Sequence, residues 1–86
     1  MSFEESQLRF PLDCQYRVIA ENIPGMHFVI ETVLQQLGIR APLVEEKRSS
    51  AGKYLAFSVE VRVESRESMN RIDQELRNIR GVKTVL

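Results

Sequence analysis

The chain of 86 residues has one cysteine, one histidine and no tryptophan. A single cysteine cannot form a disulfide within the chain, which fits a reducing compartment. One cysteine and one histidine cannot supply a Cys/His metal cluster. Nothing in the sequence favours a meeting of His27 with Cys14, Ser49 or Ser50, which nucleophilic catalysis would require. We therefore expect no metal, no cofactor and no enzymatic activity, and we interpret Cys14 as a small strand residue.

Excess charge and long apolar runs are also missing. Twelve acidic residues balance twelve basic ones, which argues against binding to nucleic acid or membranes through bulk charge. No apolar segment approaches the roughly 18 residues of a membrane span, and the N-terminus lacks the features of a signal peptide. An RNA-binding sheet needs exposed aromatic residues, and only Tyr16 and Tyr54 are available. These absences disfavour nucleic acid and membrane partners and predict a soluble, cytoplasmic protein.

The clearest pattern that is present is a strict alternation of apolar and other residues from 54 to 63. Such alternation predicts a strand with one face in the core. Residues 47–53 before it form a basic arm and a Ser-Ser-Ala-Gly turn, so 47–64 is expected to be a β-hairpin. The opposite face of the sheet is expected to be open to solvent or to a partner, with Arg17, Ile19, Tyr54, Ala56, Ser58, Glu60 and Arg62 on it.

Three other stretches are predicted to be strands. Residues 14–22 alternate with Tyr16 on their apolar face. Residues 43–49 are short and mostly charged, which is typical of a sheet edge because charge discourages pairing with other chains. Residues 82–86 form a short last strand. Residues 1–9 have no clear period and are interpreted as a mobile tail.

Two stretches show apolar residues at helical spacing. The first follows the turn 22–25, and Gly38 is expected to end it in the left-handed conformation. The second is expected to begin after Ser65 as its N-cap. His27 lies off the first stripe and is expected to be exposed. The expected apolar stripes are Met26, Val29, Ile30, Val33, Leu34 and Leu37 in the first helix, and Met69, Ile72, Leu76 and Ile79 in the second.

The predicted order of elements is β-α-β-β-α-β in a single domain, residues 10–86. Two interleaved right-handed β-α-β units with this order give a ferredoxin-like α+β sandwich. The sheet is expected to have four antiparallel strands, with the first and third in the centre. Both helices are expected to cover the same face.

Several short motifs together carry a resemblance to a known family: Phe10-Pro11, Tyr16-Arg17-Val18, Pro24, the run Ser49-Ser50-Ala51-Gly52-Lys53-Tyr54, and Val82-Lys83-Thr84-Val85-Leu86. They resemble the YbeD-like family of small bacterial proteins of uncharacterised function, from Phe10 to the C-terminus. The resemblance implies a ferredoxin-like fold similar to ACT regulatory domains, and it implies no catalytic residues.

The segment 22–25, Asn-Ile-Pro-Gly, followed by a helix and by Leu-Gly-Ile at 37–39, is also similar to the start of ACT domains. This likeness implies that an effector can bind near the Pro-Gly turn, across a subunit interface. Asn22 stands where ACT domains often carry an aspartate. The residues that the likeness makes candidates for a ligand or partner surface are Asn22, Pro24 and Gly25.

The hairpin turn supplies a second candidate surface. Backbone amides of a turn, serine hydroxyls and flanking cations can hold a carboxylate or a phosphate. The alternative is that the turn residues serve only to form the turn. The candidate residues here are Arg48, Ser49, Ser50, Gly52, Lys53 and Tyr54.

Taken together, these patterns predict a small, non-enzymatic, ACT-like regulatory domain that binds a small anionic effector, a partner protein, or both. One alternative is a protein-interaction adaptor without a ligand. Another is an enzyme of the dimeric α/β-barrel kind, which would need a buried His, Asp or Arg on the core face. The open face of the sheet is interpreted either as a plain solvent-exposed surface or as the contact surface of a homodimer.

Overall fold

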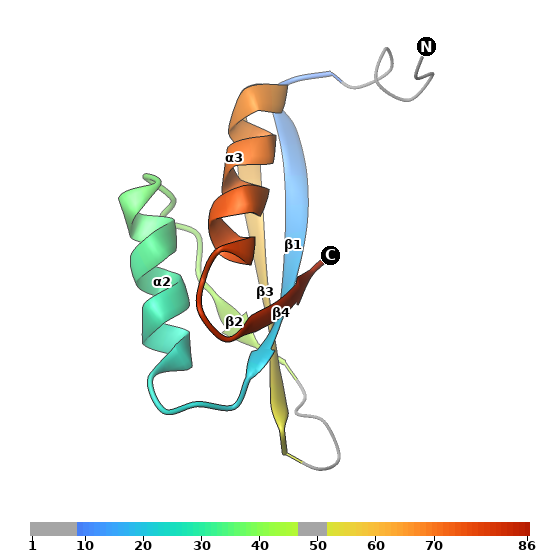
Figure 1. Cartoon of the computed structure of the whole chain (residues 1–86). Coiled ribbons are helices and arrows are strands. Elements are labelled where there is room, and N and C mark those ends of the chain that lie inside the picture. The colour runs from blue at the N-terminus through green and yellow to red at the C-terminus, as the bar shows by residue number, and fades with distance from the viewer. Residues whose placement is uncertain (1–8, 47–51) are drawn as a thin grey trace.

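The structure is a computed structural model that describes residues 9–46 and 52–86. The predicted tail therefore lies outside the described residues except for Arg9. The order of elements is the predicted one, β-α-β-β-α-β (Figure 1). The elements are β1 (Leu12–Glu21), α2 (Met26–Gln36), β2 (Val44–Glu45), β3 (Tyr54–Val63), α3 (Arg66–Arg77) and β4 (Val82–Val85).

The sheet has the strand order β2-β3-β1-β4, with β1 and β3 in the centre as predicted. These two strands pair antiparallel along their whole length, from Leu12 opposite Val63 to Glu21 opposite Tyr54. Both helices lie on the same side of the sheet (Figure 1). The predicted ferredoxin-like α+β sandwich is therefore confirmed.

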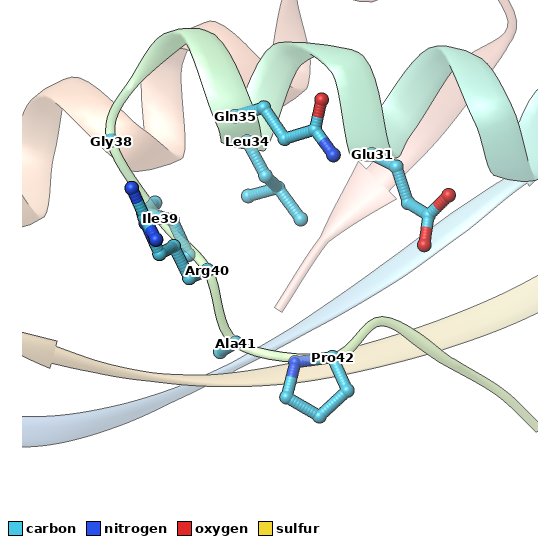
Figure 2. A pocket seen from close by; sticks show the side chains of 8 residues that line it. All are labelled: Glu31, Leu34, Gln35, Gly38, Ile39, Arg40, Ala41 and Pro42. Carbon is cyan, nitrogen blue, oxygen red and sulfur yellow. The ribbon is translucent and has the colours of Figure 1, made fainter.

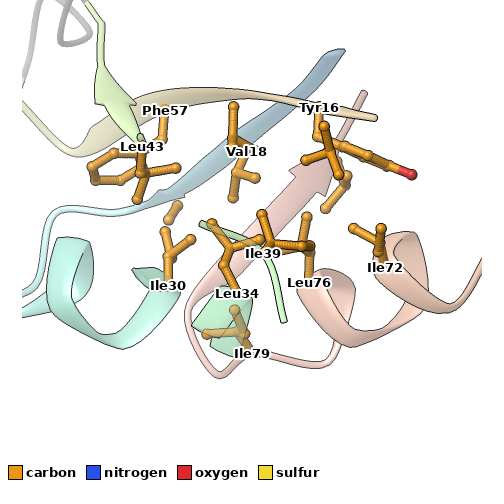
Figure 3. Close-up of a cluster of buried hydrophobic side chains, with 14 of the residues drawn as sticks. Tyr16, Val18, Ile30, Leu34, Ile39, Leu43, Phe57, Ile72, Leu76 and Ile79 are labelled. Atoms are coloured by element: carbon orange, nitrogen blue, oxygen red, sulfur yellow. The ribbon is translucent and has the colours of Figure 1, made fainter. Parts of the chain in front are cut away.

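The core lies between the helices and one face of the sheet (Figure 3). Phe57 and Val18 are fully buried on the sheet side. Ile30 and Leu34 of α2 and Leu76 of α3 cover them from the helix side, with at most 2% of their surface exposed. Since successive strand residues point to opposite faces, the alternation in β3 is sufficient to explain which side chains enter the core.

Helix α2 begins and ends at glycines with positive φ. Gly25 is its N-cap with φ 83°, and Gly38 follows its C-terminus with φ 81°. The N–H of Ile39 donates to the carbonyl oxygen of Leu34 over 2.9 Å, as in a Schellman-type end. The predicted role of Gly38 is confirmed. Val29 belongs to the predicted apolar stripe of this helix and is nevertheless 43% exposed.

Helix α3 is capped as its sequence predicts. The hydroxyl oxygen of Ser65 accepts a hydrogen bond of 3.1 Å from the backbone N–H of Ser68. Glu67 lies in the first turn and Arg77 in the last, where each charge is favoured by the helix dipole. No helix within the described part of the chain has the length and apolar character needed to cross a membrane.

The strand boundaries differ most from the prediction in β1 and β2. β1 starts at Leu12, two residues before the predicted start, because the ladder with β3 continues to Val63. β2 contains only two residues, and residues 47–49 of the predicted strand lie outside the described residues. Its predicted place at the edge of the sheet is confirmed.

Candidate functional site

The turn after β1 is hydrogen-bonded to the base of the β3 hairpin. The backbone N–H of Asn22 donates to the carbonyl oxygen of Lys53 over 2.9 Å. The side-chain amide of Asn22 donates to the carbonyl oxygen of Gly52 over 2.8 Å. Both segments lie at the same end of the molecule (Figure 1). We refer to the residues gathered here as the turn–hairpin site: Asn22, Pro24, Gly25, Gly52, Lys53 and Tyr54.

The structure thus joins two candidate surfaces that the sequence presents separately. Pro24, Gly25, Lys53 and Tyr54 are all exposed. Gly52 has φ 70°, a left-handed conformation that favours glycine. The other three candidates, Arg48, Ser49 and Ser50, lie outside the described residues, so their part in a site stays a prediction.

The N-terminus of α2 borders this site and has no side-chain cap. The N–H groups of Met26 and Val29 bond to the carbonyl oxygens of Ile23 and Gly25. Within the described ranges, the N–H groups of His27 and Phe28 have no acceptor. The first turn carries no acidic residue. In α3, by contrast, the hydroxyl oxygen of Ser65 accepts a hydrogen bond from an N–H group of the first turn. Glu67 places a negative charge in the same turn. Unpaired N–H groups and the helix dipole favour an anion at such a position.

A third turn, between α3 and β4, reaches the same end of the molecule. The N–H of Glu21 donates to the carbonyl oxygen of Gly81 over 2.8 Å. The carboxylate of Glu21 also forms an ion pair of 3.4 Å with Lys83. A Cβ atom at Gly81 would lie 2.6 Å from the terminal methyl group of Met26, so glycine permits the close approach. The sequence alone does not place Gly81 and Lys83 beside the turn–hairpin site, because only the folded sheet brings β4 to the end of β1.

His27 is only partly exposed, whereas the sequence predicts an exposed side chain. The exposed fraction of its side chain is 42%, and its Nε2 atom lies 3.3 Å from the carboxylate of Glu31. Its ring meets the ring of Phe57 edge-on, with centroids 5.4 Å apart. The first turn of α2 therefore places His27 beside the buried stripe, with one part of the ring against the core and the other toward solvent.

Two titratable side chains of β1, Tyr16 and Cys14, have raised pKa values. The hydroxyl of Tyr16 donates to the carbonyl oxygen of Met69 over 3.0 Å, and burial raises the pKa of Tyr16 to about 12. Burial, with the neighbouring charge of Asp13, also raises the pKa of the Cys14 thiol. A raised pKa disfavours the thiolate that reacts or binds metals. In the part of the chain that the structure describes, no three His, Cys, Asp or Glu side chains gather closely enough to hold a metal ion.

The open face of the sheet is less open than predicted. Ala56 and Ser58 belong to this face, yet only 6% and 9% of their surfaces are exposed. An ion pair of 3.2 Å joins Arg17 of β1 to Glu46, which follows β2. Because β3 lies between β1 and β2, this pair crosses over the small residues of β3. Short side chains flanked by longer ones are buried without any second layer. The predicted open face, available to solvent or to a partner, therefore does not include Ala56 and Ser58 as exposed residues.

Comparison with known proteins finds a family whose model matches this sequence. A family model described as "Protein of unknown function (DUF493)" matches residues 5–86. A UPF0250 protein of Paraburkholderia phytofirmans is 34% identical over 87 residues, covering 99% of this chain and 98% of the relative. A UPF0250 protein of Vesicomyosocius okutanii is 28% identical and covers 99% and 95% of the two chains. The resemblance to small YbeD-like bacterial proteins is thereby confirmed at the level of this family.

Two solved structures share the fold. The solution structure of protein HP0495 from H. pylori superposes with a TM-score of 0.78 at 22% identity, covering 92% of this chain and 85% of that one. The ACT domain from GTP pyrophosphokinase of Chlorobium tepidum superposes with a TM-score of 0.72 at 18% identity, covering 87% of this chain and 95% of that domain. At these identities the likeness concerns the fold, which is ACT-like.

Proposed function

The chain belongs to the DUF493 family, and on that premise we propose that it is a small, non-enzymatic regulatory domain whose turn–hairpin site binds a small anionic effector. The observation that carries the proposal is the pair of hydrogen bonds from Asn22 to Gly52 and Lys53. They hold the start of the α2 turn and the base of the hairpin in a fixed relation. A ligand that contacts one segment therefore meets the other.

The charges and dipoles of the site select an anion. Among residues 9–46 and 52–86, the N–H groups of His27 and Phe28 have no acceptor, so the N-terminus of α2 can donate hydrogen bonds to a ligand. Lys53 adds an exposed cation at the base of the hairpin. Asn22 replaces the aspartate that ACT domains often carry, and its neutral amide does not repel an anion. A carboxylate or a phosphate satisfies both the N–H groups and the cation.

The ACT-like fold supports a regulatory role. The ACT domain with which this chain superposes belongs to a larger protein, GTP pyrophosphokinase. The Pro-Gly turn at Pro24 and Gly25, through which this chain resembles ACT domains, is the place near which their effectors bind. An effector that bridges the turn and the hairpin would stabilise their mutual arrangement and so change the surface offered to a partner protein.

Thermal unfolding with added anions tests this proposal. Inorganic phosphate, acetate and citrate are used as probes, with sodium chloride at equal ionic strength as the reference. We expect at least one probe to raise the Tm of the native chain. The double variant Arg48→Ala with Lys53→Ala should lose that increase, while Arg71→Ala, at an exposed position of α3, should keep it. An increase that persists in the double variant would end the proposal of an anion at this site.

A second candidate function, self-association through the open face of the sheet, rests on a different observation. Val44 is 53% exposed and lies opposite Ser58 in the ladder. Leu86 is 70% exposed and hydrogen-bonds through its backbone to Arg17. Val44 and Leu86 therefore stand at the two sides of a face whose central residues, Ala56 and Ser58, lie beneath the ion pair of Arg17 and Glu46. In a two-fold dimer the same patch of both chains meets, so these exposed apolar residues at the sides of the face can be shared between two copies.

Sedimentation equilibrium at micromolar concentration tests the second candidate. We expect a dimer that Val44→Lys disrupts. The matched control is Phe28→Lys, which changes an apolar residue that is 71% exposed on α2. A monomer in the native chain would contradict self-association, as would a dimer that only Phe28→Lys disrupts.

A further inference from the structure

A cavity of about 510 Å³ lies at the C-terminal end of α2, between this helix and the segment that leads to β2 (Figure 2). Glu31, Gln35 and Arg40 give it a mostly polar lining. Leu34 and Ile39 also line it, but they are core residues with at most 9% of their surface exposed. Such a lining selects no class of ligand, so we assign none to the cavity.

The free edge of the sheet at β4 carries backbone groups that can pair with another strand. β4 is the last strand in the order β2-β3-β1-β4, so one of its sides has no neighbouring strand within the described ranges. The N–H and the carbonyl oxygen of Leu86 both bond to Arg17 of β1. Because successive residues of a strand direct these groups to opposite sides, the N–H and the carbonyl oxygen of Val85 point to the free side. A free edge of this kind is a template for a strand of a second chain.

The composition of β4 favours such pairing. Residues 82–86 read Val-Lys-Thr-Val-Leu, with three β-branched residues and a single charge. β-branched residues favour strands, and a low charge favours pairing between chains. The single charge, on Lys83, forms an ion pair of 3.4 Å with Glu21 of the same chain, which compensates it in part.

The opposite edge of the sheet is protected by its own sequence. β2 contains only two residues, Val44 and Glu45, and Glu46 follows it. A short strand with acidic residues offers little to an incoming strand. Since β4 is longer and carries less charge, its edge needs protection of another kind.

A side chain of α3 covers the free edge of β4. Arg77, in the last turn of α3, donates from its Nη2 atom to the carbonyl oxygen of Val85 over 2.7 Å. Its Nε atom donates to the carboxylate of Asp73, one turn earlier in the helix, over 2.8 Å. Helix α3 and β4 pack against each other (Figure 1), so the guanidinium reaches the strand while the ion pair holds it in place.

We propose that Arg77 is a strap that keeps β4 from pairing with the β4 strand of a second copy of this chain. The guanidinium bonds to the carbonyl oxygen that would otherwise accept the N–H of the incoming strand. Asp73 is a positioning residue, because its carboxylate holds the guanidinium over the edge. Without the strap, the same edge of two copies meets around a two-fold axis, and the two sheets join through Val85. This edge is separate from the turn–hairpin site and from the open face of the sheet, so the inference depends on neither.

Sedimentation velocity from micromolar to millimolar concentration tests the strap. Arg77→Ala should lower the Kd of self-association at least about tenfold relative to the native chain, because an incoming strand no longer displaces a charge-assisted hydrogen bond. Arg71→Ala removes an exposed arginine from the same helix and should behave as the native chain does. The proposal is overturned if Arg77→Ala associates no more tightly than Arg71→Ala.

Backbone amide resonances of the isotope-labelled variants locate the contact and show that each variant is folded. As the concentration of Arg77→Ala rises, the amides of Lys83 and Val85 should shift, and exchange of the Val85 N–H with solvent should slow because it gains an acceptor. Asp73→Asn keeps Arg77 and removes only its ion pair, so it should give a weaker form of the same response. Shifts that centre on Val44 instead, or an equally fast exchange of Val85 in the native and variant chains, would contradict pairing through β4.

Discussion

The side-chain amide of Asn22 donates a hydrogen bond of 2.8 Å to the carbonyl oxygen of Gly52, a residue 30 positions further along the chain. A second bond runs from the backbone N–H of Asn22 to the carbonyl oxygen of Lys53. These bonds connect the turn that starts α2 with the hairpin that starts β3. They make one surface of two segments that are distant in sequence, and that surface is where we propose that an effector binds.

Replacement of Asn22 tests this connection. Asn22→Ala removes the side-chain donor and keeps the backbone bond, so we expect the free energy of unfolding to fall by about 1 kcal/mol. The anion-induced increase in Tm should fall as well, because the two segments are less firmly held together. Asn70→Ala, at an exposed position of α3, is the control. Urea denaturation measures the first effect, and an unchanged stability would show that the bond is not formed in solution.

The alternation in β3 makes a prediction about two residues that lie three positions apart. Phe57 is fully buried, whereas Glu60 is exposed on the other face. Phe57→Ala should lower the free energy of unfolding by about 3–5 kcal/mol, since it removes a large side chain from the core. Glu60→Ala should change it by no more than about 0.5 kcal/mol. Similar losses in the two variants, measured by urea denaturation, would mean that the register of β3 is wrong.

Stability at alkaline pH depends on Tyr16. Its pKa is raised from the ordinary value of 10.0 to about 12, so the folded state holds the phenol proton more tightly than the unfolded state does. The buried, neutral phenol of Tyr16 therefore makes its full contribution to the free energy of unfolding below pH 10. That contribution is lost as the pH rises toward 12, because the unfolded state releases the phenol proton first. Unfolding of Tyr16→Phe should show less of this loss across the same pH range. Tyr54→Phe, which removes the other phenol of the chain, should retain it.

The left-handed conformation of Gly25 predicts that the loss of stability on substitution depends on which residue is introduced. Its φ is 83°, and a Cβ atom added there would meet no atom within 4 Å beyond its neighbours in the chain. Gly25→Ala should therefore cost about 1 kcal/mol through backbone strain alone. Gly25→Asn should cost less, because asparagine tolerates this conformation better than alanine. Thermal unfolding of both variants measures the difference, and a smaller loss for alanine than for asparagine would contradict the observed backbone.

The sequence predicts the fold through local patterns. The alternation around Phe57, the cap at Ser65 and the glycine at Gly38 each depend on a few neighbouring residues, and each is found as predicted. Burial of a side chain at the edge of a helix's apolar stripe depends instead on the helices and strands packed against that helix. Val29 is exposed although it follows the helical period, because the period identifies an apolar stripe and does not show how far the adjoining elements cover it.

The candidate site shows the same division. The Pro-Gly turn and the hairpin are visible as separate motifs. The bond from Asn22 to Gly52 has no periodic signal, since it joins two turns whose proximity depends on the pairing of β1 with β3. The burial of Ser58 beneath the ion pair of Arg17 and Glu46 is a similar case. It requires three neighbouring strands, and no stretch of sequence contains them together.

The most direct test of the proposed function is a titration of the isotope-labelled chain with inorganic phosphate and with citrate, followed through the backbone amide resonances. Binding at the turn–hairpin site predicts concentration-dependent shifts of the amides of His27, Phe28, Gly52 and Lys53 that saturate, and that Lys53→Gln weakens. If these amides do not shift, or if the shifts are the same in Lys53→Gln as in the native chain, the turn–hairpin site does not bind an anion in the way proposed.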